Sequence, residues 1–286
     1  MPPFVWIPAL VLIGFGALWL FLIAPGRAGS EKSRPFYGRN IAHRGLYDNQ
    51  TFAPENTLAA FDAAVASGYG VELDVQLSAD GEVVVCHDDT LDRVCGFEKR
   101  VDACTMAELG EVRIFDSPES VPAFSAVLSH IGGKVPVIVE LKHGKHDREL
   151  CEKTLSLLRS FPGEYCIESF DPRIVAFFRK HAGDILRGIL SQPTRWYREA
   201  GFGPLTAFSL GNLLWNVIAR PEFIAYRIGE KPVSVRIAEK MGALRVSWTS
   251  REEKNEKDAD VVIFEGYRPG VRYKTLKNPT ASESEK

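Results

Sequence analysis

The first 26 residues of this 286-residue chain lack aspartate, glutamate, lysine and arginine, and Arg27 is the first charged side chain. In the whole chain 25% of residues are charged, so the gap stands apart from the rest. Residues 4–24 are almost entirely apolar. A helix of about 20 residues, rising about 1.5 Å per residue, crosses a hydrocarbon core of roughly 30 Å. The segment therefore predicts one N-terminal transmembrane helix.

The features of a cleaved signal peptide are also missing from this segment. A signal peptide has a basic start, a shorter apolar region and a small-x-small cleavage site, whereas this chain opens Met1-Pro2-Pro3. Trp6 and Trp19 lie near the two ends of the apolar run, as interfacial aromatic rings often do. Positive charges follow it, at Arg27, Lys32, Arg34 and Arg39. The pattern favours a retained single-pass anchor with the rest of the chain in the cytoplasm.

Three further absences narrow the class of protein. The five cysteines are odd in number and form no CxxC pair, which excludes a disulfide framework and a cysteine zinc site. Lysine and arginine total 35 against 37 aspartates and glutamates, so no basic excess indicates a nucleic-acid partner. No repeat of 20–50 residues is visible. A globular domain of about 260 residues remains after the anchor.

That domain alternates short β-rich runs with longer amphipathic ones. Helical patterns occur at 57–67, 147–160, 172–181, 212–219 and 233–241. Strand patterns occur at 40–43, 71–77, 82–86, 135–141, 165–170, 186–190, 223–226, 244–248 and 261–264. Alternating βα units imply a parallel sheet, and this many units predict a closed (β/α)₈ barrel of the TIM type.

One of the nine strand patterns does not belong to the barrel count. The runs 71–77 and 82–86 flank Ser78-Ala79-Asp80-Gly81, and Asp-Gly between two β runs indicates a two-residue hairpin. The run 82–86 should then be antiparallel and outside the barrel, which leaves eight strands. With Asp80 and Gly81 as the loop, Asp74 would lie directly opposite His87. A one-residue shift of register would break that pairing.

Polar residues gather where the proposed barrel strands end. His43, the pair Glu72 and Asp74, and Glu140 fall near carboxyl ends of strands, and the hairpin returns His87 to the same face. Three converging carboxylates either raise one another's pKa or bind a hard cation such as Mg²⁺ or Ca²⁺. Two imidazoles beside the metal suit general acid and base catalysis.

Cationic side chains complete the set. Arg44 and Lys142 suit a phosphate group, and metal, cations and histidines together indicate phosphoester cleavage rather than glycoside hydrolysis. Each residue alone has an ordinary structural explanation. A histidine at a strand end is commonly structural, Glu-x-Asp is commonly a solvated face, and Asn56 could simply cap a helix.

The ordered combination resembles the glycerophosphodiester phosphodiesterase family, bacterial type. The resemblance extends over about residues 41–269. It is carried by His43-Arg44-Gly45, Pro54-Glu55-Asn56-Thr57, Glu72-Leu73-Asp74-Val75, Cys86-His87-Asp88, Glu140-Leu141-Lys142, Ser169-Phe170-Asp171-Pro172 and Trp248-Thr249.

The resemblance implies a membrane-anchored, metal-dependent hydrolase that converts glycerophosphodiesters to sn-glycerol 3-phosphate and an alcohol. His43 and His87 would be the acid and base. Glu72, Asp74 and Glu140 would hold Mg²⁺ or Ca²⁺. Arg44, Lys142 and Trp248 would contact substrate, with Glu55 and Asn56 in support. The expected divisions are an anchor (1–26), a linker (27–38), the barrel domain (39–272) and a polar tail (273–286).

The family pattern is not followed near the end of the chain. The family commonly has Asn after the Trp-Thr pair and Asp-Arg-Pro at the last strand, whereas this chain has Ser250 and then Glu265-Gly266-Tyr267-Arg268-Pro269. The family pattern therefore does not assign the residues of the leaving-group pocket. Trp248 is either a wall of that pocket or an aromatic residue of the barrel core. Two other functions remain: a lysophospholipid phosphodiesterase and an inactive scaffold. The apolar stretch 202–226 either packs on the barrel or lies on a membrane.

Overall fold

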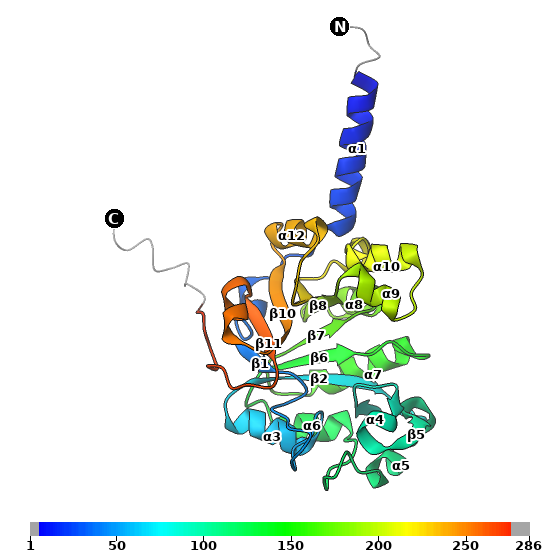
Figure 1. The fold of residues 1–286 in the computed structure, drawn as a ribbon, viewed down its shortest axis with the longest axis vertical. Helices are drawn as coiled ribbons and strands as arrows, with labels where there is room; N and C mark the ends of the chain where they lie inside the picture. Colours follow the sequence, from blue (N-terminus) through cyan, green and yellow to red (C-terminus); the bar gives the residue numbers. More distant parts are fainter. Residues whose placement is uncertain (1–5, 276–286) are drawn as a thin grey trace, which may run out of the picture.

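Eight parallel strands close into a barrel in the computed structural model, which describes residues 6–275 (Figure 1). Strand β1 pairs with both β2 and β11, and these two pairings close the ring. The predicted (β/α)₈ barrel is therefore confirmed. In chain order the barrel strands are β1 (Asn40–Ala42), β2 (Gly70–Leu77), β6 (Val137–Leu141), β7 (Tyr165–Ser169), β8 (Leu186–Ser191), β9 (Phe223–Arg227), β10 (Leu244–Ser250) and β11 (Val261–Phe264).

Helices connect successive strands and cover the outside of the ring. They are α3 (Leu58–Ala66), α6 (Phe124–Ile131), α7 (Asp147–Arg159), α8 (Pro172–His181), α9 (Thr194–Glu199), α10 (Pro204–Gly211), α11 (Asn216–Ala219) and α12 (Val233–Lys240). Four of the five predicted helices agree with these bounds to within one residue at each end. The helix predicted at 212–219 is wrong in its first half, because Leu213 adopts a left-handed backbone (φ 59°) and the helix starts at Asn216.

The hairpin after β2 is confirmed, and it opens a larger excursion than expected. Strand β3 (Val83–Val85) returns antiparallel to β2 and lies outside the barrel. It is followed by β4 (Thr90–Leu91), α4 (Asp92–Cys95), β5 (Phe97–Arg100), a 3₁₀ turn η2 (Val101–Ala103) and α5 (Met106–Glu111).

The register predicted for that hairpin is wrong by one residue. Val75 lies opposite Val85, so Asp74 lies opposite Cys86 and not opposite His87. The Gly81 amide donates to the Ser78 carbonyl at 3.0 Å, and the Ser78 amide donates to the Glu82 carbonyl at 2.9 Å. The loop thus has three residues, with Gly81 (φ 78°) in the left-handed conformation that such loops require.

Alternation along the strands fills the barrel interior with two kinds of side chain. Apolar residues such as Ile41, Ile138 and Cys166 pack together in the barrel core with Phe36. Two residues further along β6 and β7, the same inward positions carry Glu140 and Glu168. The interior therefore changes from apolar to acidic toward the carboxyl ends of the strands.

The N-terminal helix α1 (Trp6–Ile23) projects away from the barrel (Figure 1). Its mean hydropathy is 2.3, and only 6% of it is buried, so by length and composition it is a candidate membrane span. The segment predicted as a linker, 27–38, contains α2 (Ser30–Ser33) and the buried Phe36. Residues 1–5 of the predicted anchor and 276–286 of the predicted tail lie outside the described residues.

Candidate active site

A cavity of about 730 Å³ lies at the carboxyl ends of the barrel strands. The predicted site residues that line it are His43, Arg44, Glu55, Glu72, His87, Glu140 and Trp248. The other three, Asn56, Asp74 and Lys142, are joined to these residues by hydrogen bonds and ion pairs. The structure thus brings all ten predicted side chains together.

The three predicted carboxylates form a compact group beneath the cavity. Glu72, Asp74 and Glu140 are buried, and one oxygen of each lies within 4.8 Å of the others. Burial raises the pKa of Glu72 well above its usual value, and the carboxylates of Asp74 and Glu140 raise it further. Burial alone would also raise the pKa of Asp74, but nearby cations, foremost Lys142, hold it well below its usual range.

Glu168 is a fourth acidic residue of this group that sequence reasoning missed. It pairs in register with Glu140 on the neighbouring strand, it is buried, and it lines the cavity. Its Oε2 has no hydrogen-bond partner among residues 6–275. Burial raises the pKa of Glu168 well above its usual value, followed by the charges of Glu140 and Asp74. Aligning Glu140-Leu141 with Glu168-Ser169 as adjacent strand ends could have found it.

This donor set fits a divalent cation. Carboxylate oxygens are hard ligands of the kind that Mg²⁺ and Ca²⁺ prefer, and a group of close buried carboxylates is costly without a counter-charge. Lys142 supplies part of it, since its Nζ lies 2.7 Å from Glu140 Oε1 and 3.0 Å from Asp74 Oδ1. These partners raise the pKa of Lys142, although burial opposes them. Lys142 therefore contacts the carboxylates, where the sequence predicted a phosphate contact.

His43 is oriented by a carboxylate that sequence reasoning also missed. Its Nδ1 lies 2.8 Å from Glu265 Oε2, and its Nε2 lies 3.9 Å from Glu72 Oε2. Burial lowers the pKa of His43, against the opposing effect of Glu265. Burial would raise the pKa of Glu265, but the hydrogen bond from His43 and others nearby lower it to about 2. Glu265 directly follows β11, as His43 directly follows β1, and these strands are neighbours.

His87 reaches the cavity from beyond the end of β3 and has its own carboxylate partner. Its Nδ1 lies 2.6 Å from Asp88 Oδ1. Asp88 in turn accepts from Arg93 Nε at 2.6 Å. The side chain of His87 is 33% exposed and that of His43 15%. Because Nδ1 of each imidazole is occupied, Nε2 is the nitrogen of each that is left for substrate.

Arg93 connects this histidine to the Pro-Glu-Asn-Thr segment. Its guanidinium donates to both oxygens of Glu55, at 2.7 and 2.8 Å. Arg44 Nη1 donates to Glu55 Oε1 at 2.6 Å. Burial alone would raise the pKa of Glu55, but these two arginines and Asn49 lower it to about 2. Glu55 is thus occupied as the anchor of two arginines.

Two residues in left-handed backbone conformations hold the loop after β1. Arg44 (φ 54°) uses its amide to donate to Glu72 Oε2 at 3.0 Å. Asn56 (φ 57°) donates from its backbone N–H to the Arg44 carbonyl, and from its side-chain Nδ2 to Asp74 Oδ2 at 2.9 Å. Thr57, and not Asn56, caps α3, because its hydroxyl accepts from the Ala60 amide. The capping alternative for Asn56 is therefore wrong.

An aromatic wall closes one side of the cavity. Trp248 donates from Nε1 to the Ala225 carbonyl at 2.9 Å and meets the ring of Phe170 edge-on at 5.6 Å between centroids. The Arg227 guanidinium lies 5.6 Å from the centre of the Trp248 ring. The indole is therefore fixed in the wall with a cation beside it.

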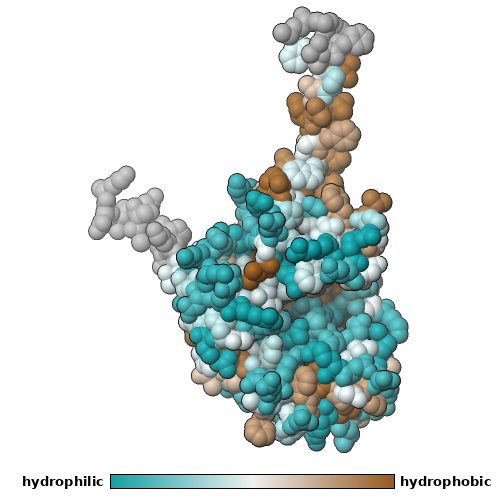
Figure 2. Space-filling view, in the orientation of Figure 1, coloured by the Kyte–Doolittle hydropathy of each residue, from teal (hydrophilic) through white to brown (hydrophobic). Residues whose placement is uncertain are grey.

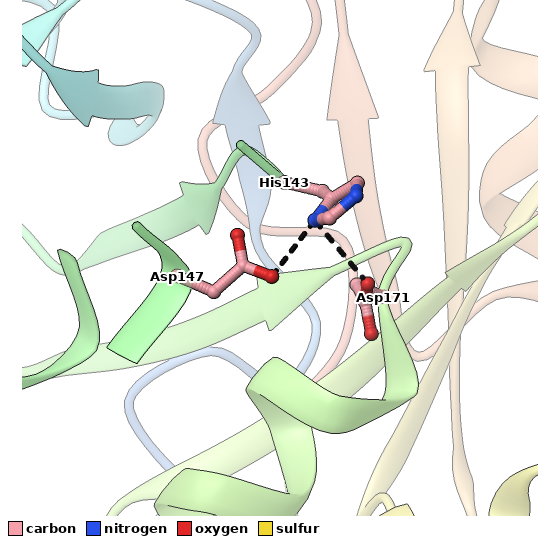
Figure 3. Close-up of side chains that lie close together, drawn as sticks. All are labelled: His143, Asp147 and Asp171. Atoms are coloured by element: carbon pink, nitrogen blue, oxygen red, sulfur yellow. Dashed lines mark hydrogen bonds and ion pairs between the residues drawn. The ribbon is translucent and has the colours of Figure 1, made fainter. Parts of the chain in front are cut away.

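A second acidic group lies outside the cavity (Figure 3). His143 Nδ1 is 2.8 Å from Asp147 Oδ2 and 3.5 Å from Asp171 Oδ2. Asp147 also accepts from the Gly144 amide, and Asp171 accepts from the amide and guanidinium of Arg173. These carboxylates have local donors and fasten the loops before α7 and α8.

Comparison with known proteins agrees with this geometry. The model of the glycerophosphoryl diester phosphodiesterase family matches residues 43–267. The chain belongs to this family. It is therefore a phosphoric diester hydrolase by family, and the matched span begins at His43 and includes all ten predicted site residues.

Two curated relatives illustrate the similarity. YhdW of Bacillus subtilis is 35% identical over 162 residues, which are 54% of this chain and 65% of that protein, just under two thirds of its length. A glycerophosphodiester phosphodiesterase of Caldanaerobacter subterraneus is 32% identical over 198 residues, covering 64% of this chain and 78% of the relative.

A solved structure shares the fold. A phosphodiesterase of Oleispira antarctica, in complex with the product sn-glycerol-3-phosphate, has a TM-score of 0.64 at 22% identity. The similarity covers 80% of this chain and 93% of the other. At this identity the likeness concerns the barrel fold alone.

Proposed function

We propose that the protein hydrolyses glycerophosphodiesters to sn-glycerol 3-phosphate and an alcohol. The observation that carries the proposal is the composition of the cavity. Two histidines, each hydrogen-bonded through Nδ1 to a carboxylate, line it together with members of a buried acidic group. Family membership supports the reaction class. The product named for the Oleispira phosphodiesterase supports the glycerol 3-phosphate half of the substrate.

Glu72, Asp74 and Glu140 would hold Mg²⁺ or Ca²⁺, with Glu168 close by. When bound, such a cation polarises phosphoryl oxygens and neutralises charge that develops during phosphoester cleavage. Lys142 and the Arg44 amide position the carboxylates through contacts at 2.7–3.0 Å. The Arg44 guanidinium lines the cavity and offers the fork geometry that suits a phosphate.

The two histidines would divide the proton transfers. One Nε2 accepts the proton of the attacking hydroxyl or water, and the other donates a proton to the departing alcohol oxygen. Glu265 and Asp88 fix the two imidazole rings by binding Nδ1, which keeps each Nε2 directed to the substrate. Trp248 and Phe170 form an apolar wall for the alcohol group.

We further propose that α1 is retained as a membrane anchor and that the barrel lies on the cytoplasmic side. The carbonyls of Phe21 and Ala24 accept from Arg220 Nη1 at 2.8 and 2.7 Å, and the Ile23 carbonyl accepts from the buried Asn216. The last carbonyls of a helix lack intrahelical donors, so the barrel caps this helix. A signal sequence destined for removal would need no such joint. The lysines and arginines that follow α1 favour the cytoplasmic side.

Turnover by the purified full chain in detergent tests the activity. The substrates are glycerophosphocholine and lysophosphatidylcholine, with Mg²⁺ or Ca²⁺ present and glycerol 3-phosphate and choline assayed. We expect glycerol 3-phosphate and choline from glycerophosphocholine, with turnover at least about 10²-fold slower in His43→Ala. His130→Ala, a substitution on the outer helix α6, is the matched control and should retain activity.

Other results would favour the remaining functions. Turnover of the lysolipid alone would replace the proposal by a lysophospholipid phosphodiesterase. Equal inactivity of the wild type and His43→Ala with every metal would indicate a scaffold.

A further inference from the structure

The chain has a second charge-free stretch, far from the first in sequence. Between Glu199 and Arg220 there are 20 consecutive residues without aspartate, glutamate, lysine, arginine or histidine. The stretch contains all of α10 and α11. One side of it packs inward through the buried Ala207 and Leu213. A buried face accounts for only part of its apolar character.

Large apolar side chains of the same stretch point outward. Leu205 is 85% exposed and Phe208 54% exposed, and Phe202 and Trp215 are each 44% exposed. Phe202 is partly covered by the ring of Tyr197, whereas Leu205 and Phe208 are more exposed than covered. Soluble proteins seldom gather exposed large apolar residues on one short segment unless a partner covers it.

The stretch meets the foot of α1. Asn216, the residue after Trp215, donates from Nδ2 to the Ile23 carbonyl at 2.9 Å. Arg220 binds the last turn of α1, and the Gly26 amide donates to the Pro221 carbonyl at 2.9 Å. Helix α10 lies in the upper part of the molecule, near the base of α1 (Figure 1), and brown, hydrophobic atoms lie beside that base (Figure 2).

The contacts between the C-terminal end of α1 and Asn216, Arg220 and Pro221 determine where a bilayer would meet the barrel domain. Ile23 is fully buried and the carbonyls of the last turn are capped, so α1 leaves the barrel in a set direction. A bilayer crossed by α1 must then have its surface at the foot of the helix. Trp215 lies there, and tryptophan is enriched at the membrane–water interface.

We propose that residues 202–215 form a second membrane contact, which inserts its apolar side chains into the interface of the bilayer that α1 crosses. The inference rests on the proposed membrane anchor. The bilayer is the occupant because the patch is continuous with the apolar α1 and the stretch around it is uncharged. A soluble protein partner would not need to sit against the foot of a transmembrane helix.

The contact would also bring the catalytic cavity close to the bilayer surface. A pocket of about 430 Å³ lies beneath the stretch, lined by residues that include Tyr197, Phe202 and Leu210. Phe170 lines both this pocket and the catalytic cavity. The two cavities thus share one aromatic lining residue.

Photocrosslinking in liposomes tests the contact. The full chain, reconstituted in tagged phosphatidylcholine vesicles, carries benzoylphenylalanine at one position: Leu205, Phe208, Leu12 or Phe97. Leu12 is an exposed position of α1, and Phe97, 43% exposed on β5 at the opposite end of the barrel, is the matched control. Turnover of glycerophosphocholine checks that each variant is folded.

We expect lipid adducts at positions 12, 205 and 208 at least tenfold above those at position 97. Adducts at 12 but only the control level at 205 and 208 would overturn the second contact and leave the anchor intact. The control level at 12 as well would overturn the anchor and the contact with it. Adducts at 205 and 208 to a second copy of the chain would replace the bilayer by a dimer interface.

Discussion

The catalytic cavity and the end of the barrel that carries α1 depart from the usual distribution of side chains in opposite ways. In the cavity, acidic groups such as Glu72 and Asp74 are buried, and the partly buried Lys142 pairs with Asp74. At the α1 end, apolar groups such as Leu205 and Phe208 are exposed. Burying charge and exposing apolar surface both cost free energy. Each region is therefore explained best as a binding site for a partner that is not part of the chain.

The two regions differ in how strongly they determine function. In the cavity network, Asp74, Glu140, Glu55 and Glu265 each contact a cation or an imidazole. A single substitution among these residues therefore leaves another charge unpaired. The proposed membrane contact beside α1 depends on the apolar area that enters the bilayer, and a single substitution there removes only a small part of that area. We therefore expect large effects from the first region and graded effects from the second.

The largest effect is expected from Glu72→Gln/Asp74→Asn. The double change removes two of the three buried carboxylates that we propose hold the cation, so turnover of glycerophosphocholine should fall at least about 10³-fold. Asp62→Asn/Glu149→Gln, on outer helices, is the matched control. Circular dichroism of both proteins separates loss of the site from loss of the fold. Undiminished turnover in the first double variant would contradict the assignment.

The next largest effect is expected from His43→Ala, which we compare with a substitution of its hydrogen-bond partner Glu265. Removing a proton-transfer group costs roughly 10²- to 10⁴-fold, so we expect His43→Ala to lower kcat by this amount. Glu265→Gln keeps a hydrogen-bonding side chain of nearly the same shape and should lower kcat by a smaller factor, with KM little changed. Steady-state kinetics on both variants would measure the split. An unchanged kcat in Glu265→Gln would remove Glu265 from the positioning of His43.

The stability of the Arg44–Glu55–Arg93 cluster should depend on pH. The pKa of Glu55 is lowered from 4.5 to about 2, so its contribution is complete above the unfolded pKa and is lost as pH falls toward 2. The shift corresponds to roughly 3 kcal/mol near neutral pH. Urea unfolding of the full chain in detergent should show wild type above Glu55→Gln at pH 7, and the gap should narrow between about pH 5 and pH 2. A gap independent of pH would contradict this origin.

The smallest effect is expected at the joint with α1. Arg220→Ala removes two hydrogen bonds to the carbonyls of Phe21 and Ala24, each worth about 0.5–1.5 kcal/mol. Tryptic cleavage after the exposed Arg27 should become several-fold faster in Arg220→Ala than in Arg236→Ala, a control on the surface of α12. Equal cleavage rates would mean that the joint does not hold the helix in place.

The sequence was sufficient to predict the barrel because its βα alternation has one common solution. Eight strands remained once Asp80-Gly81 was recognised as a turn, and the structure confirms that number within residues 6–275. The turn did not determine its own length, because an Asp-Gly pair fits two-residue and three-residue loops alike. The resulting register error left His87 in the cavity, since the chain leaves the ladder at Val85, before this residue.

The missing members of the site were those that depend on registers between strands. Glu168 lies one residue before the end of β7, and Glu265 directly follows β11. A single carboxylate at either place is an ordinary pattern in isolation. They become significant only when β7 is aligned with β6 and β11 with β1. Helix α10 was missed because it is short, it begins with Pro204 and ends with Gly211, and apolar residues such as Leu205 and Phe208 point outward instead of toward the core.

The measurement that tests the central claim most directly is turnover of glycerophosphocholine by the full chain after treatment with EDTA. If the buried carboxylates hold a divalent cation that the reaction requires, the chelated protein should be inactive, and adding Mg²⁺ or Ca²⁺ should restore glycerol 3-phosphate release. The Glu72→Gln/Asp74→Asn protein should stay inactive after the same addition. Full turnover in EDTA would contradict the proposed role of the acidic group.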